Sequence, residues 1–288
     1  EVPEAAPSLQ RRAVLAYSGG VDSNFALVDQ LEHPGRDGRE LVTGVLVQGF
    51  DVPLDAGEGF AATLADARAS TAAMGVPLTV VCTNMREAFS RQWPDEFGAA
   101  LAACLAVFAP LAGTGLVAAD HDYRHLVFPW GSNVITNPML SSDAFRLLTL
   151  GSALGRTERV RRLAGHPALT EHIRVCWLGT VPGRNCGTCE KCIRTKLNFI
   201  AAGIPVPDGL GAMPGFLDVI GLVADDRQKI DFLADIAAAG RQGTMPSDTR
   251  LALVLCIWKN RLLGPVRHLR RKRRNIGRWL TGRPPRRH

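Results

Sequence analysis

The chain has 288 residues, 46% of them hydrophobic and 21% charged, which is ordinary for a globular protein with a proper core. Its apolar runs are shorter than the roughly 18 residues of a membrane span, and an odd number of cysteines, seven, argues against a secreted disulfide framework. The net charge of +7 belongs to residues 265–288, which hold ten Lys or Arg and no acid; removing those ten leaves −3 for the rest. We therefore predict a cytoplasmic protein with a basic tail.

Strand-like and helical patterns alternate along the first half of the chain. The strand-like runs are residues 11–17, 41–50, 76–84 and 113–120. Helical patterns lie between them, from Ser23 to about Leu31, over 57–75 and over 94–113. The strand-like runs are rich in Val and Leu with little alternation, as in strands buried on both faces. This order predicts an α/β fold with a doubly wound, mostly parallel sheet.

After about residue 150 the pattern becomes helical. Residues 141–165 predict one or two helices, carrying Arg146 and Arg156, and a cysteine segment, 176–195, precedes a helix starting near Arg194. A linker over 203–215 and helices over 216–239 and 247–262 follow. We divide the chain into an α/β domain (1–165), a cysteine module (166–203), a helical extension (204–264) and the basic tail (265–288).

The string Ser-Gly-Gly-Val-Asp-Ser, residues 18–23, joins the first predicted strand to the first helix. Glycines allow a close approach to a ligand, and a helix N-terminus offers unpaired N–H groups to an anion. Ser18 and Ser23 add hydroxyl donors. Asp22 is unusual in an anion site unless a divalent cation bridges the carboxylate and phosphate oxygens. The alternative is a tight turn with an N-cap, but the whole string favours a phosphate site.

Four cysteines are spaced as metal ligands: Cys176, Cys186, Cys189 and Cys192 read C-x9-C-x2-C-x2-C. Thiolates three residues apart in a tight turn can share one metal, and a fourth completes a tetrahedron. Zinc and an iron–sulfur cluster are both considered; the ferredoxin run would place a Pro after its fourth cysteine, which is absent here. The other three, Cys82, Cys104 and Cys256, lie in apolar runs and are expected in the core.

The string at 18–23 resembles the SGGxDS signature of the PP-loop ATP pyrophosphatase superfamily, a group of adenine nucleotide alpha-hydrolase-like proteins. All positions match: Ser18, Gly19, Gly20, Val21 at the free position, Asp22 and Ser23. The resemblance implies a HUP-type α/β domain whose loop binds the β,γ-pyrophosphate of ATP, with Mg²⁺ at Asp22. It also implies cleavage of ATP to AMP and pyrophosphate, with Asp22 and Ser23 catalytic.

The cysteine layout is similar to that of the 7-cyano-7-deazaguanine synthase branch of this superfamily. There a late cysteine and a following CxxCxxC run with a trailing Arg, here Arg194, bind a structural Zn²⁺. The resemblance covers roughly residues 11–203, is strong at the two motifs and loose between them. The segment 123–148 departs from the one characteristic of that synthase. The chain therefore looks like a divergent relative, and its deazaguanine substrate is not carried over.

The carboxyl ends of the strands carry the remaining candidates, because ligands of open α/β sheets bind there. We expect Phe50, in 47–51, near the adenine or ribose. We expect residues 118–133 to line the substrate side, with Asp120 and Ser132 binding the cofactor. The other candidates in that segment are His121, Asp122 and Trp130; any of these loop residues could instead be a solvated turn residue.

Three cations of the following segments are expected at the same pocket. Arg156, Lys191 or Arg194 should meet phosphate or a carboxylate, because arginine offers a planar bidentate fork to both. We take Arg156 and Arg194 as catalytic. The alternative for Arg156 is a solvated helix residue.

The leading function is an ATP-dependent ligase that adenylates a carboxylate or amide-like oxygen of a small-molecule substrate, which ammonia or an amine then attacks. The alternatives are a tRNA or small-molecule sulfur transferase, for which Cys82 is the one plausible active cysteine, in a stretch that looks mostly buried, and a non-enzymatic zinc module that binds nucleic acid. Partners considered are a second copy of the chain and a separate nitrogen or sulfur donor protein.

In the tail, Val266, Leu269, Arg273, Ile276 and Leu280 fall on one helical face. The tail is either a solvated end or a contact to an anionic surface: a membrane, RNA or an acidic partner.

Overall fold

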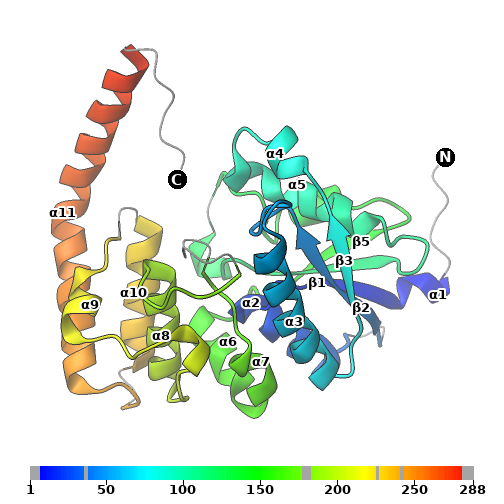
Figure 1. The fold of residues 1–288 in the computed structure, drawn as a ribbon, viewed down its shortest axis with the longest axis horizontal. Coiled ribbons are helices and arrows are strands. Elements are labelled where there is room, and N and C mark those ends of the chain that lie inside the picture. Colours follow the sequence, from blue (N-terminus) through cyan, green and yellow to red (C-terminus); the bar gives the residue numbers. More distant parts are fainter. Residues whose placement is uncertain are drawn as a thin grey trace. The chain divides into compact units, whose positions relative to one another are not determined.

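The computed structural model describes residues 7–35, 38–126, 128–176, 183–224, 227–240 and 243–280 (Figure 1). The chain forms two compact units, Glu1–Ala212 and Met213–His288. The four-part division expected from the sequence is finer than this, and its boundaries stay predictions.

The first unit is built on a five-stranded parallel sheet. Its strands are β1 (Arg12–Ala16), β2 (Glu40–Gln48), β3 (Leu78–Cys82), β4 (Thr114–Ala118) and β5 (Arg146–Leu150), in the order β3-β2-β1-β4-β5. In the central strand, Leu15 is in register with Gly44 on β2 and Leu116 on β4. This is a Rossmann-like α/β domain with the strand order of HUP-class folds, and the predicted fold class is confirmed.

Helices cover both faces of the sheet (Figure 1). On one face, α2 (Val21–Glu32), α3 (Gly57–Ala73) and α7 (Pro167–Glu171) pack on Leu15. On the other face, α5 (Trp93–Ala106) packs on Val14. Val14 and Leu15 are both fully buried. They are neighbours in β1, and successive side chains of a strand point to opposite faces, so each packs against a different layer of helices. Short elements complete the unit: α1 (Pro7–Gln10), α4 (Met85–Ala88), and 3-10 turns at Tyr123–His125, Asn137–Leu140, Leu163–Gly165 and Asp208–Leu210.

The prediction of helices alone over 141–165 is wrong. Arg146–Leu150 forms the edge strand β5, and only Arg156–Arg162 forms an α-helix, α6, so that Arg146 and Arg156 lie on different elements. A five-residue apolar run suits a strand or a buried helix equally by its periodicity. Here β4 offers it an open edge, and Gly151, at φ +83°, follows the strand.

Helix α8 (Glu190–Ala202) begins four residues before the predicted start, with Cys189 at its N-cap, and Gly203 at φ +74° ends it. The second unit contains α9 (Phe216–Gly221), α10 (Arg227–Ala239) and α11 (Ser247–Leu280), and its core includes Val219, Leu233, Ile236 and Leu253. Helix α11 runs on past residue 265, where the tail was expected to begin. Within the described residues, no helix has both the length and the apolar character that crossing a bilayer requires.

Candidate functional site

The loop at 18–23 lies at the point where the strand order reverses. It follows β1, and residues 119–133 follow β4, the neighbour of β1 on the side away from β2. In doubly wound sheets, the connections after two such strands run to opposite faces of the sheet, and a crevice opens between them at the carboxyl ends of the strands. The sequence string and the residues expected to face it therefore come from the two strands that flank this crevice.

Ser23 closes the loop onto the start of α2. Its Oγ accepts from the backbone N–H groups of Gly20 (3.1 Å) and Ser18 (3.3 Å) and lies 3.2 Å from Ser18 Oγ. Gly19 has φ +73°, a conformation that favours glycine, and Gly20 is the N-cap. The N-cap is thus a glycine and not the Asp or Ser on which the alternative interpretation rests, and the contacts place two hydroxyls and several amides at one helix N-terminus.

Asp22 bridges two arginines of α6. Arg156 Nη2 donates to Asp22 Oδ2 at 2.6 Å, and Arg159 Nη1 donates to Oδ1 at 2.7 Å. Burial by itself raises the pKa of Asp22, but the two arginines outweigh it, so that the pKa lies below the ordinary value. Arg156 was predicted for this site. Asp22 is thus an ionised carboxylate with both oxygens engaged.

Arg159, which sequence reasoning missed, joins the loop to the segments that follow β4 and β5. Its side chain is 2% exposed, and besides Asp22 it donates to the carbonyls of Ala119, Gly151 (3.0 Å) and Leu154 (3.1 Å). These carbonyls follow β4 and β5. The available signal was the three-residue spacing from Arg156, which places both guanidinium groups on one helical face.

Two further cations, Lys191 and Arg194, interact electrostatically with the Asp22 carboxylate. Burial lowers the pKa values of Lys191 and Arg194, and Arg156 and Asp22 act electrostatically on both. Arg194 donates to Glu190 Oε1 at 2.6 Å. Of the three predicted cations, Arg156 contacts Asp22 directly, and Lys191 and Arg194 lie within electrostatic range of it. That they bind phosphate or carboxylate stays a prediction.

The residues after β4 divide into two groups. Asp120 accepts from Trp130 Nε1 at 2.9 Å; burial, together with Asp22, raises the pKa of Asp120 to about 6. Burial, together with Arg156, lowers the pKa of His121 to about 4. The charges of Asp22 and Arg156 therefore act on both Asp120 and His121. Asp122 instead pairs with Arg124 and His125 in its own turn, as the alternative for such loop residues expected.

Phe50 and Ser132 are not joined to the loop by a contact in the described part of the chain. The Ser132 hydroxyl is buried and accepts from Asn137 Nδ2 at 3.0 Å. The Phe50 ring meets Trp93 edge-on, with centroids 4.8 Å apart. This contact continues through Phe97 and Trp130 to His121, an aromatic row that sequence reasoning missed. Cofactor binding by Phe50 and Ser132 stays a prediction.

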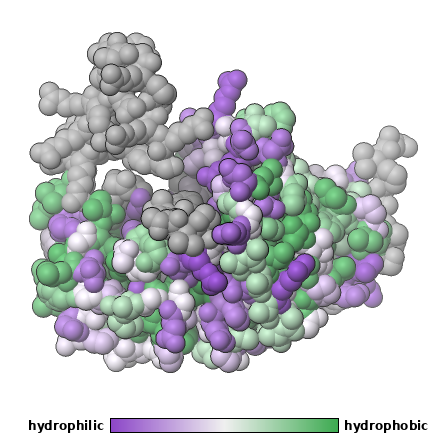
Figure 2. Space-filling model, viewed as in Figure 1, coloured by the Kyte–Doolittle hydropathy of each residue, from purple (hydrophilic) through white to green (hydrophobic). Residues whose placement is uncertain are grey.

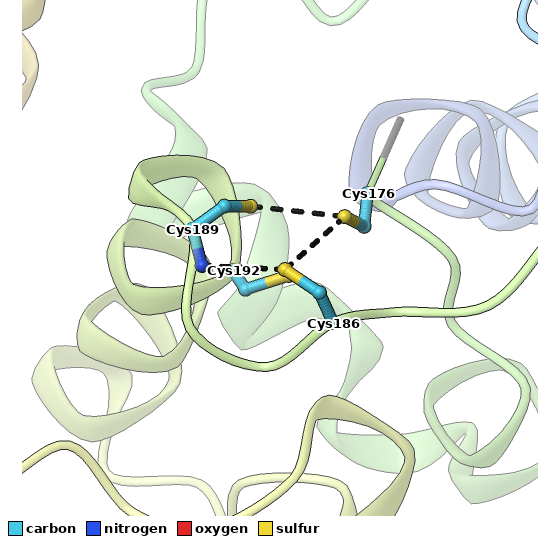
Figure 3. A group of neighbouring side chains, drawn as sticks. All are labelled: Cys176, Cys186, Cys189 and Cys192. Atoms are coloured by element: carbon cyan, nitrogen blue, oxygen red, sulfur yellow. Dashed lines mark hydrogen bonds between the residues drawn. The ribbon is translucent and has the colours of Figure 1, made fainter. Parts of the chain in front are cut away.

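The four predicted ligand cysteines converge, with their thiols turned toward one another (Figure 3). Cys176 Sγ lies 3.5 Å from Cys186 Sγ and 3.7 Å from Cys189 Sγ, and Cys186 Sγ lies 4.0 Å from Cys192 Sγ. A Zn–S bond of about 2.3 Å gives a tetrahedron with sulfur–sulfur edges of about 3.8 Å. An iron–sulfur cluster would distribute the thiolates over two or four irons, so that at least some of them would lie farther apart. The spacing therefore suggests Zn²⁺.

Backbone geometry and two side chains form the cysteine turn. Gly187 has φ +75°, and the Cys189 N–H donates to Cys186 Sγ at 3.3 Å. Asn185 accepts from the N–H of Cys176 (3.1 Å) and donates to the Ile173 carbonyl (2.8 Å), so that it holds the two ligand segments together. Lys196 Nζ donates to the Gly187 carbonyl at 2.7 Å. Sequence reasoning found neither Asn185 nor Lys196.

The cysteine cluster and the loop at 18–23 are in direct contact. The Arg174 N–H, two residues before Cys176, donates to the Gly19 carbonyl at 2.9 Å. Val21, inside the loop, belongs to the same buried cluster as Val160, Cys176 and Cys192. The loop at 18–23 and the cysteine cluster thus share one buried hydrophobic cluster.

The expectation that Cys82 is a core residue is wrong, whereas it is confirmed for Cys104 and Cys256. Cys82 ends the edge strand β3 and is exposed, and its thiol donates to Gln48 Oε1 at 3.4 Å. An edge strand has a neighbour on only one side, so its end is less covered.

Comparison with known proteins found no family model and no curated relative that matches this chain.

Proposed function

We propose that this protein is an ATP-dependent adenylating enzyme with a structural zinc site. It would cleave ATP to AMP and pyrophosphate and activate a carboxylate or amide-like oxygen for attack by ammonia or an amine. One observation supports this most: the Ser-Gly-Gly-Val-Asp-Ser loop stands at the switch point of a β3-β2-β1-β4-β5 sheet, where Arg156 pairs with Asp22 and where Lys191 and Arg194 lie within electrostatic range of that carboxylate.

The charge around the loop suits a polyphosphate. Arg159 is held by three backbone carbonyls, whereas the Arg156 side chain is 21% exposed. We infer that Arg159 fixes Asp22, and that Arg156 is the arginine able to turn to an incoming phosphate. Both Asp22 oxygens are engaged, so this arrangement by itself does not fit Mg²⁺. In this proposal Mg²⁺ enters with the nucleotide.

The donor set suits Zn²⁺ as a structural ion. The chain supplies four thiols at tetrahedral spacing, which leaves no position for a reacting molecule. We expect one Zn²⁺ per purified chain by elemental analysis. Cys189→Ser should lower zinc content and melting temperature, because metal binding contributes folding free energy. Cys82→Ser, outside the cluster, is the control and should change neither. Iron with sulfide in anaerobically purified protein would refute the zinc assignment.

The products of ATP cleavage test the enzymatic proposal. The protein is incubated with ATP, Mg²⁺, ammonia and a panel of carboxylates, and AMP and pyrophosphate are measured. Asp22→Asn and Ser23→Ala should reduce turnover by about 10²-fold or more while the protein stays folded. Asp55→Asn, an exposed carboxylate outside the site, should be unchanged. Formation of ADP and phosphate would contradict the proposal.

One observation keeps sulfur transfer as a second candidate. Cys82 is an exposed thiol at the carboxyl end of β3, the same edge of the sheet as the loop. A sulfur transferase needs an accessible thiol to carry a persulfide. Cys82→Ser would then abolish transfer of labelled sulfur to tRNA or a small acceptor, with AMP still the nucleotide product. Full activity of Cys82→Ser would leave C–N ligation as the function.

A further inference from the structure

Helix α11 is apolar on two opposite faces within the second unit. One face packs inward: Ala252, Leu253, Cys256 and Asn260 are fully buried, and Asn260 Nδ2 donates to the Leu222 carbonyl at 3.0 Å. The other face carries the exposed stripe Leu251, Leu255, Trp258 and Leu262, whose residues are 43–70% exposed. At about 100° per residue the two sets lie on opposite sides of the helix. Figure 2 shows hydrophobic side chains at the left edge, where Figure 1 draws α11 and α9.

The sequence continues this stripe along the rest of the helix. Val266, Leu269, Ile276 and Leu280 follow Leu262 at the same helical spacing. The other positions between 265 and 280 are mostly basic, and residues 265–288 hold ten Lys or Arg and no acid. At 1.5 Å per residue, residues 251–280 of this helix cover about 45 Å, and the sequence is rich in cations over the second half of that length.

We propose that α11 docks in the plane of an anionic lipid surface, with the stripe from Leu251 to Leu262 inserted among the acyl chains and the basic residues on the headgroups. A helix with an apolar stripe and Lys or Arg on its remaining face is suited to this position. Trp258, 59% exposed, is a residue type favoured at the membrane interface.

The combination of charge and apolar surface favours an anionic bilayer over RNA or a second copy of the chain as the partner of α11. RNA matches the basic residues but gives the apolar stripe no partner. A second copy paired stripe to stripe in parallel would bring its ten cations beside those of the first, without acids to compensate. An anionic bilayer satisfies both features, because it offers hydrocarbon and negative charge within a few ångströms of one another.

Vesicle flotation of the full chain tests the proposal. We expect binding to phosphatidylcholine vesicles containing phosphatidylserine, little binding to pure phosphatidylcholine, and weakening as salt is raised. Leu262→Glu should reduce binding at least about tenfold, because it removes one buried leucine from the inserted stripe. Leu111→Glu is the matched control, an exposed leucine of the first unit, and should bind as the parent does. Circular dichroism of both variants checks that they are folded.

Three results would overturn the proposal. The first is Leu262→Glu binding like the parent protein. The second is equal binding to neutral and anionic vesicles. The third is a dimer in solution, measured by sedimentation without lipid, that Leu262→Glu dissociates, since a second copy would then cover the stripe.

Discussion

Replacing Arg159 by methionine should destabilise the first unit by about 3–5 kcal/mol. Its side chain is almost fully buried, and it donates to Asp22 and to the carbonyls of Ala119, Gly151 and Leu154. Removing one partner of a buried ion pair costs about 3–5 kcal/mol, and each buried acceptor left without a donor costs about 1–3 kcal/mol. These two losses cannot simply be added, because they concern the same side chain and because Asp22 still pairs with Arg156 in the variant. We therefore expect a total loss within the range given for the ion pair alone.

Urea unfolding of the full chain measures this loss, and hydrogen exchange of peptides from β4 and β5 assigns it to the first unit. The matched control is Arg161→Met on the same helix. Arg161 pairs with Glu158, whose side chain is 41% exposed, and donates to the Ala201 carbonyl at 3.3 Å; together these contacts contribute about 0.5–2.5 kcal/mol, which is less than the loss expected for Arg159. If Arg159→Met and Arg161→Met shifted the free energy of unfolding equally, the claim that Arg159 joins the loop to β4 and β5 would be refuted.

Three further predictions concern the cysteine turn and the end of β4. Gly187→Ala should weaken zinc retention in a chelator competition, because alanine at φ +75° costs about 1–2 kcal/mol and its Cβ would lie 3.0 Å from a carbonyl oxygen; retention equal to that of Gly165→Ala, where a Cβ meets open space, would contradict this. Lys196→Met should cost about 1.5–3 kcal/mol of stability in urea, because the ammonium donates to the carbonyl of Gly187 in the turn and to that of Ala212; an unchanged midpoint would show that the turn closes without it. Asp120→Asn should raise the melting temperature above pH 6, where burial penalises the ionised carboxyl, whose pKa is about 6. That advantage should disappear below the ordinary value of 3.8, where the folded and unfolded carboxyl are both neutral, and an advantage equal at both pH values would refute the raised pKa.

Sequence patterns predicted the parts of the fold that are governed by local chemistry. The Val- and Leu-rich runs of β1 and β4 and the middle of β2 are buried on both faces, and this burial shows directly in composition, whereas β3 at the edge is only partly buried. The cysteine spacing predicted one cluster for the four thiols, because three of them lie within seven residues and the fourth lies ten residues before these. β5 was missed because its five residues become a strand only beside the open edge of β4.

The supporting residues of the site could not be predicted for a different reason. Arg159 looks like any helical arginine, and its burial depends on three carbonyls that other strands bring to it. Asn185 contacts Cys176 and Gly209 only after the chain has folded back. Cys82 lies in an apolar run, and only its place at the edge of the sheet exposes it. Some of the partners, such as Asp22 and Ala119 for Arg159, are distant in sequence, and the nearer ones come within reach only through the fold, so no local pattern could reveal these roles.

The hydrogen bond from Arg174 to Gly19 has a thermodynamic consequence. It joins a residue two positions from a thiol of the cluster to the backbone of the loop, and Val21 shares its core with Cys176 and Cys192. If ordering this segment by metal tightens ligand binding at the loop by some factor, the same ligand must tighten metal binding by that factor, because linkage is reciprocal. Chelator resistance of the purified protein would then report which small molecules occupy the loop, before any reaction is known.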